Sequence, residues 1–253
     1  MSRLRNRGPI WARPAPGARQ PRFSRDQIAQ AAIAIADKEG FAQVSMRRIA
    51  EVVGAGTMTL YHYVRTKEDL LTLIEDALTA EWLIPPGEMP AGWRAGLTEI
   101  ARRARDAMLR HPWALHSLQG VRMGPNGLRH VEQTMAALAD APFGQDVRLE
   151  LAATIDDFVF GYALRALDSP QEAYLDPHAV KAFNQIMAGH LASGEFPHVA
   201  AFIGKETPAQ AFAQAAKVMN DERRFASSLE SILDGAAARG DGAGARRRRK
   251  SRG

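Results

Sequence analysis

The chain of 253 residues contains no cysteine. It can therefore form no disulfide framework, no thiolate metal site and no cysteine nucleophile. No apolar run approaches the roughly 20 residues that a membrane-spanning helix requires, and the N-terminus lacks the continuous apolar segment of a secretory signal. These absences predict a soluble, cytoplasmic protein with no membrane partner.

The signatures of common catalytic sites are missing as well. The seven histidines include no pair four residues apart around a glutamate, which excludes a zincin-type metal site. There is no glycine-rich phosphate loop followed by Lys and Ser or Thr, and no nucleophile-elbow pattern. We therefore expect no enzyme activity, no catalytic residue, no metal and no cofactor.

The net charge of +5 is unevenly placed. Residues 1–23 carry six arginines and no acid, and residues 239–253 carry seven basic residues against Asp241, so the body between them is acidic. Both ends are rich in Gly, Pro or Ala, which predicts two disordered basic segments. The N-terminal arm could follow DNA phosphates or enter a minor groove. Either segment could instead be a solubilising tail.

Residues 45–71 have the pattern of a helix-turn-helix unit. Ser45 can cap a helix whose apolar residues recur at helical spacing (Met46, Ile49, Ala50 and Val53). Gly54 and Gly56 then allow a sharp turn. Thr57 can cap a second short helix, in which Leu60 and Val64 face inward.

The opposite side of this second helix has an unusual composition. It presents Thr57, Met58, Tyr61 and His62 and no acidic residue. Such a surface suits contacts with base edges and phosphates in a major groove. Further on, Thr66 to Asp69 form a near capping box that opens a third helix. Lys67 lies in its first turn, where a bound DNA phosphate would offset the unfavourable position of a cation, although it could equally be a solvated surface lysine.

The segment from Phe41 to Leu71, with its core TLYHYVRTKEDLL, resembles the DNA-binding domain of the tetracycline-repressor (TetR) family of bacterial transcription regulators. The resemblance implies DNA contacts from Thr59, Tyr61, His62 and Tyr63 on the recognition helix, a base or phosphate contact from Arg47 on the preceding helix, and a phosphate contact from Lys67. Met58 and Gly56 occupy positions that vary in the family, so the bases that are read stay open. The expected DNA-binding residues also include Ser45, Thr57 and Met58.

The whole chain is predicted to be all-α. A first helix should begin at the capping box Ser24–Gln27 and end at Gly40. Body helices are expected at 67–83, 92–110, 112–119, 126–140, 145–168, 176–192 and 207–237, separated by Gly and Pro. The predicted organisation is a basic arm (1–23), a DNA-binding domain (24–70), a regulatory and dimerisation domain (71–238) and a basic tail (239–253).

The family resemblance also implies a homodimer and a small-molecule effector. The helices at 145–168 and 207–237 would pair with those of a second copy, although the apolar stripe of the latter could equally be ordinary core. Aromatic and polar residues in the body are candidates for the effector site: Trp113, His116, Met123, Asn126, Asp157, Phe158 and Tyr162. Asp156 and Asp157 would need partners if they were buried. Each of these residues could instead be core or surface.

The sequence therefore predicts a homodimeric repressor that binds a palindromic operator in double-stranded DNA and is released by a small molecule. Two other functions fit parts of the pattern. One is a helical small-molecule-binding protein without specific DNA readout, and the other is a non-specific DNA binder that acts through its basic ends.

Overall fold

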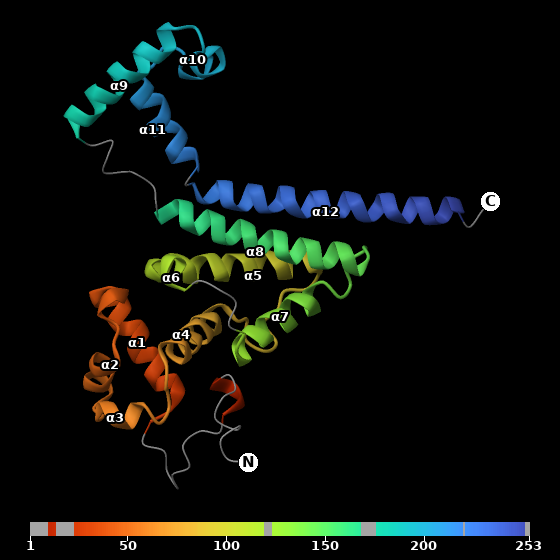
Figure 1. Cartoon of the computed structure of the whole chain (residues 1–253). Coiled ribbons are helices and arrows are strands. Elements are labelled where there is room, and N and C mark those ends of the chain that lie inside the picture. Colours follow the sequence, from red (N-terminus) through yellow and green to blue (C-terminus); the bar gives the residue numbers. More distant parts are fainter. Residues whose placement is uncertain (1–9, 14–22, 119–122, 168–175, 220, 251–253) are drawn as a thin grey trace.

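The computed structural model describes residues 10–13, 23–118, 123–167, 176–219 and 221–250 (Figure 1). Within these ranges the chain is helical and contains no strand. None of the helices in this part of the chain has the length and hydropathy of a membrane span. The elements are η2 Ile10–Ala12, α1 Arg25–Glu39, η3 Phe41–Gln43, α2 Met46–Val53, α3 Thr57–Leu60, α4 Lys67–Trp82, α5 Trp93–Arg110, α6 Pro112–Ser117, α7 Pro125–Ala137, α8 Gln145–Leu167, α9 Pro177–Ala192, α10 Pro197–Ile203, α11 Pro208–Met219 and α12 Glu222–Lys250.

The first four helices form a unit whose ends follow the predicted capping chemistry. The Ser24 side chain accepts a hydrogen bond from the backbone of Gln27, and the Gln27 side chain accepts one from the backbone of Ser24, which confirms the capping box. The Ser45 hydroxyl caps α2 by accepting from the Arg48 N–H at 3.2 Å. Gly54 ends α2 with φ of 70°, a left-handed conformation that favours glycine.

The N-terminal arm is not wholly disordered, so this part of the prediction is wrong. Residues 10–12 form a 3₁₀ turn, and Ile10 is buried in the same core as α1, α2 and α4. Arg13 forms a buried ion pair with Asp69 of α4. The apolar pair Ile10-Trp11, which sequence analysis passed over among the arginines, explains why this segment packs. Residues 1–9 and 14–22 lie outside the described residues.

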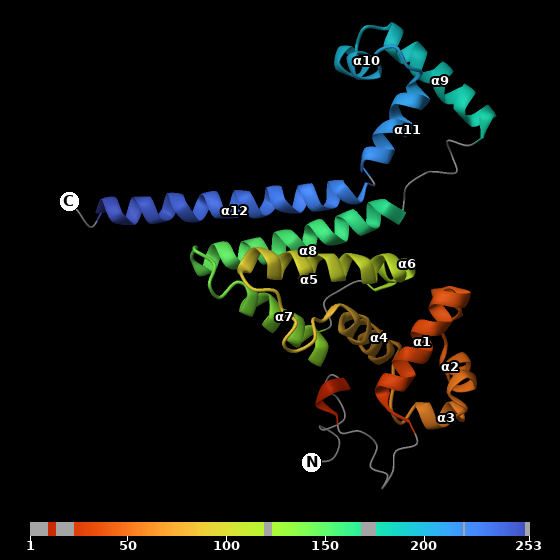
Figure 2. The same ribbon diagram turned by 180° about the vertical axis from the view of Figure 1, so that it is seen from behind.

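The body is built in layers (Figures 1 and 2). The second half of α4 packs against α5 and α7, α5 packs against α8, and α8 packs against α12. Leu97 of α5, Leu151 and Ile155 of α8, and Leu229 and Leu233 of α12 meet in one buried core. Thus α4 is a continuous link between the helix-turn-helix unit and the body.

A buried carboxylate joins α4 to α7. Asp76 is almost fully buried and accepts hydrogen bonds from the backbone N–H groups of Asn126 and Gly127, at 2.8 and 3.2 Å. The Asn126 side-chain amide donates a third at 2.9 Å. Asp76 therefore accepts hydrogen bonds from free N–H groups at the start of α7. Its negative charge also interacts favourably with the positive end of the α7 dipole.

The single helix expected at 207–237 is two helices, α11 and α12. The Asp221 carboxylate accepts from the Arg223 N–H at 2.8 Å and starts α12 afresh, a cap that the apolar periodicity did not reveal. Sequence analysis also missed α10. The helices α9, α10 and α11 pack on one another and project from the body (Figures 1 and 2).

The basic C-terminal segment is helical as far as Lys250, whereas we expected disorder from residue 239. The run of arginines favours a helix whereas the three glycines before it do not, and the preceding turns of α12 have already met the cost of nucleation. Arg239, the first of these basic residues, pairs with Glu150 of α8 through two nitrogen–oxygen contacts of 2.6 and 2.7 Å. Residues 251–253 lie outside the described residues.

Candidate nucleic-acid interface and effector pocket

The short helix α3 and the turn after it present the side chains expected to read DNA. Leu60 and Val64 are fully buried and anchor the segment to the core, as predicted. Met58 is 75% exposed and Tyr61 43% exposed, and Thr59 and His62 also lie on the surface. Because α3 ends at Leu60, Tyr61 and His62 project from the turn rather than from a long helix.

Two expected roles in this segment need correction. Tyr63 is only 6% exposed and belongs to the core cluster of the helix-turn-helix unit, so its side chain supports the fold instead of offering a DNA contact. The turn after Leu60 brings this position round to the inner side. Thr57 is the first residue of α3 and does not cap it; Gly56 is the cap residue, with no side-chain hydrogen bond.

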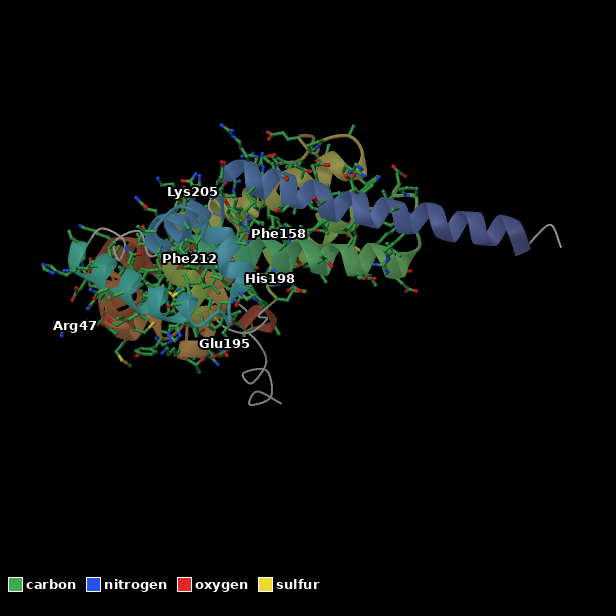
Figure 3. The ribbon with its side chains drawn as sticks, turned by 90° about the horizontal axis from the view of Figure 1, so that it is seen from above. Arg47, Phe158, Glu195, His198, Lys205 and Phe212 are labelled. Atoms are coloured by element: carbon green, nitrogen blue, oxygen red, sulfur yellow. The ribbon has the colours of Figure 1, made fainter. Side chains whose placement is uncertain are left out.

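On α2, the Arg47 side chain is accessible to a molecule that binds at the protein surface. Its side chain is almost fully exposed and makes a single 3.3 Å contact with Glu51 on the same helix, and Figure 3 shows it at the periphery of the molecule. Exposed ion pairs of this kind contribute little to stability. A DNA phosphate could therefore replace Glu51 as the partner of Arg47 at small cost.

A shallow depression of about 490 Å³ joins several of the expected DNA-binding residues. Its rim includes Ser45 at the start of α2, Tyr61 after α3 and Lys67 at the start of α4. Arg65 and Thr66 line it as well, and Arg65 is a basic residue that sequence analysis did not select. The fold thus places hydroxyl groups and cations from the starts of α2 and α4 and from the turn after α3 around one concave surface.

The start of α4 is held by Asp69. Thr66 caps the helix by accepting from the Asp69 N–H at 3.0 Å, as predicted, and the Asp69 carboxylate also accepts from the Arg65 N–H at 3.0 Å. Arg13 supplies the second partner of this carboxylate. Burial raises the pKa of Asp69, but the hydrogen bonds from Arg13 and the Arg65 backbone outweigh it and hold the pKa below its usual value.

We expect Asp69→Asn to destabilise the protein by about 3 kcal/mol at neutral pH, because it leaves Arg13 buried without its counter-charge. A carboxyl group with a lowered folded-state pKa contributes stability above its unfolded pKa, near 4, and this contribution is lost as the pH falls further. Thermal unfolding from pH 7 to pH 3 should therefore show the gap between wild type and Asp69→Asn narrowing below about pH 4. A gap that stays constant across this range would contradict the assignment.

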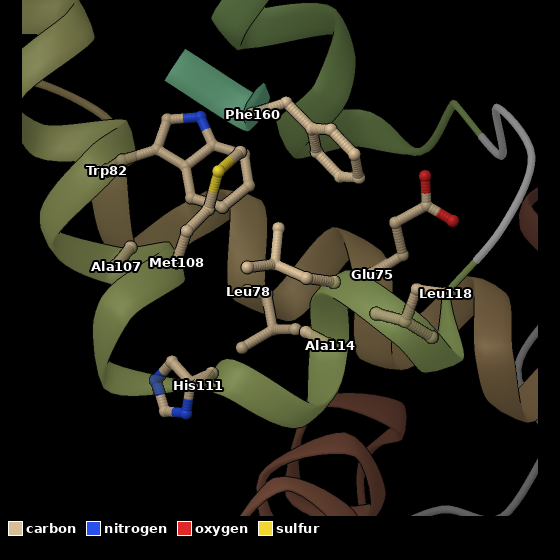
Figure 4. Close-up of a pocket in the computed structure, with 10 residues that line it drawn as sticks. Glu75, Leu78, Trp82, Ala107, Met108, His111, Ala114, Leu118 and Phe160 are labelled. Carbon is tan, nitrogen blue, oxygen red and sulfur yellow. The ribbon is translucent and has the colours of Figure 1, made fainter. Parts of the chain in front are cut away.

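An apolar cavity of about 140 Å³ lies where α4, α5, α6 and α8 meet (Figure 4). Leu78 and Trp82 of α4, Met108 of α5 and Phe160 of α8 supply most of its wall, and Glu75 and His111 add polar groups. It is a mainly apolar site with few polar groups, as is usual for small-molecule binding.

None of the residues chosen from the sequence as effector ligands lines this cavity. Trp113 stacks on Phe41 and donates to Asp37, while Asn126 holds Asp76. His116, Met123 and Asp157 are exposed, as is Asp156. Phe158 and Tyr162 pack on Phe225 in the core between α8 and α12, where Figure 3 shows Phe158.

We call α3 and the turn after it the reading segment. It is exposed on the helix-turn-helix unit, and the continuous helix α4 joins that unit to a helical body with its own cavity. This arrangement is that of a DNA-binding regulator with both domains in one polypeptide. Residues 28–74 match the model for bacterial regulatory proteins of the tetR family, and residues 85–239 match that for the tetracyclin repressor-like C-terminal domain. The chain belongs to the TetR family of transcription regulators.

Individual relatives of the chain are named as regulators or repressors of transcription as well. The chain is 32% identical over 234 residues to the transcriptional repressor DrrR1 of Streptomyces coeruleorubidus, covering 88% of this chain and 80% of that one. It is 36% identical over 157 residues to a transcriptional regulator of Saccharopolyspora erythraea, covering 61% of this chain and 66%, just under two thirds, of that one.

Among solved structures, ActR from Streptomyces coelicolor is similar in fold. Its apo form gives a TM-score of 0.64 at 27% identity over 89% of this chain and 100% of ActR. Its complex with actinorhodin gives a TM-score of 0.59 at 27% identity, over 85% and 96% of the two chains.

Proposed function

We propose that this protein is a homodimeric repressor that binds a palindromic operator and releases it when a small molecule occupies the cavity between α4, α5, α6 and α8. The observation that carries the proposal is the pairing of exposed Met58 and Tyr61 with fully buried Leu60 and Val64. A fixed backbone beneath exposed side chains that can reach base edges is what base reading requires. The relatives are named as regulators and repressors, and we propose no catalytic role and a cytoplasmic location.

We further propose the division into a DNA-binding domain at 24–70 and a regulatory and dimerisation domain at 71–238. A single reading segment spans only a few base pairs, so specific binding calls for two copies related by a two-fold axis. We assign the dimer contact to the outer faces of α8 and α12. On α8 this face carries the exposed apolar side chain of Leu149, at 50% exposure.

The cavity indicates the kind of effector. Its walls are aliphatic and aromatic, with Glu75 and His111 as the polar groups, which favours a mainly apolar molecule with few hydrogen-bonding groups. The relative ActR has been solved with actinorhodin bound, which supports a small-molecule effector here without identifying it.

Selection of bound DNA from a random pool by the full-length protein tests this proposal. We expect a symmetric consensus whose half-sites lie about one helical turn, or a multiple of it, apart. Recovery of unrelated sequences with equal affinity would favour the non-specific binder that acts through the basic ends. An absence of any DNA binding would favour a small-molecule-binding protein without DNA readout.

A further inference from the structure

His111 lies between the helix-turn-helix unit, the linking helix and the body. It follows α5 directly, precedes α6, and is only 8% exposed. Its Nδ1 is 2.7 Å from a carboxylate oxygen of Asp37 on α1, and its Nε2 is 3.0 Å from one of Glu81 on α4. One imidazole ring thus contacts a carboxylate on each of two helices that it does not belong to.

These distances favour the imidazolium form. A neutral imidazole has one N–H donor and one acceptor nitrogen, whereas an ionised carboxylate only accepts. Both contacts are hydrogen bonds only when both ring nitrogens carry a proton, and the ring is then a cation between two anions. Loss of that proton leaves one nitrogen lone pair facing a carboxylate oxygen, which is repulsive.

Other groups around the ring fix the carboxylates in place. Arg110 of α5 contacts the same Glu81 oxygen at 2.9 Å. The Trp113 indole of α6 donates to the same Asp37 oxygen at 2.7 Å and stacks on Phe41, just after α1. Glu75 of α4 lines the cavity that His111 also lines. Two carboxylates therefore contact the ring, and one arginine contacts one of them. The net negative charge of these three groups favours a positively charged ring.

The ring also forms part of the cavity wall (Figure 4). A molecule that enters the cavity therefore contacts His111, whose ring nitrogens contact Asp37 of α1 and Glu81 of α4. The orientation of α1 sets that of α2 and α3, because all three share the core around Ile49 and Leu60. A change at His111 is thus passed to the reading segment through packed helices.

We propose that His111 is a positioning residue for DNA binding, whose imidazolium form holds α1 and α4 in the orientation that reads the operator. This rests on the proposed function. Operator binding then favours the protonated ring, so operator affinity falls as the pH rises and the ring loses its proton. Protonation of the ring raises operator affinity. A molecule in the cavity that displaces the ring lowers it.

The test measures the dissociation constant of the full-length protein for its selected palindromic DNA from pH 6 to 8.5 at constant ionic strength. We expect wild-type affinity to fall about tenfold across this range, and His111→Gln, which stays neutral, to give a weak and nearly flat profile. His116→Gln is the matched control, since this exposed histidine lies five residues away on α6. His62→Gln is needed as well, because His62 also carries an imidazole and lies exposed on the reading face.

Retention of the slope by His111→Gln, or its loss in His62→Gln alone, would overturn the proposal. If His111→Gln fails to fold, Asp37→Asn keeps the ring and removes one counter-charge, and it should flatten the profile; an unchanged slope in Asp37→Asn overturns the proposal equally. Failure of the wild type to bind any DNA refutes the proposed function itself, whereas tight operator binding that is independent of pH refutes only the role of His111.

Discussion

Tyr61→Ala is expected to weaken binding to the best operator by roughly thirtyfold or more. A good base contact contributes about 1–3 kcal/mol of discrimination, and a two-fold symmetric dimer loses the contact twice. Tyr61 is exposed and lies outside the core, so its truncation should leave the free energy of unfolding within about 0.5 kcal/mol of wild type. Fluorescence anisotropy with the selected operator measures the affinity, and thermal unfolding checks the fold.

Two comparisons define what kind of contact is lost. Lys67→Ala should weaken all DNA sequences alike and lower the salt dependence by about one phosphate contact per protomer. Leu128→Ala, at an exposed apolar position on α7, should change neither affinity nor specificity. If Tyr61→Ala binds the operator as tightly as wild type, Tyr61 is not a reading residue; if it loses affinity for all sequences equally, it contacts the backbone and not the bases.

The helix-turn-helix unit could be predicted because its information is local. Ser24, Ser45 and Thr66 cap helices through residues three positions away, and Leu60 and Val64 face inward because of their spacing along the segment. Chain geometry over a few residues decides such features, and the sequence records them directly.

The effector pocket could not be predicted in the same way, because distant partners decide it. Trp113 has the size of a ligand-binding aromatic residue, yet its indole N–H donates a hydrogen bond to Asp37, 76 positions earlier. Asn126 is used by Asp76, 50 positions earlier. The cavity that we propose for the effector is lined by residues such as Leu78, Ala107 and Leu115, which have no unusual chemistry and come together only where four helices meet. Arg13 shows the same limit, because its partner Asp69 lies 56 positions later in the sequence.

Gly124→Ala is expected to destabilise the protein by about 3 kcal/mol, through a steric conflict with Asp76. A Cβ atom at position 124 would lie 2.2 Å from a carboxylate oxygen of Asp76 and 2.9 Å from its Cβ, so the whole side chain must move. Asp76 is buried and holds three hydrogen bonds at the start of α7. Overpacking costs roughly 1–3 kcal/mol, and N–H groups that lose their acceptor add to it.

Gly127→Ala, three residues further on, is the matched control. Its added Cβ would meet only the Met123 side chain at 3.5 Å, an ordinary contact, and alanine favours a helix over glycine by up to about 1 kcal/mol. For a chain of this length, 3 kcal/mol corresponds to a melting temperature lower by roughly 6–12 °C. Calorimetry should therefore show Gly124→Ala melting well below wild type and Gly127→Ala at or above it. Equal melting of the two variants would mean that Asp76 can move freely, and that the α4–α7 contact does not help to fix the linking helix on which the reading segment depends.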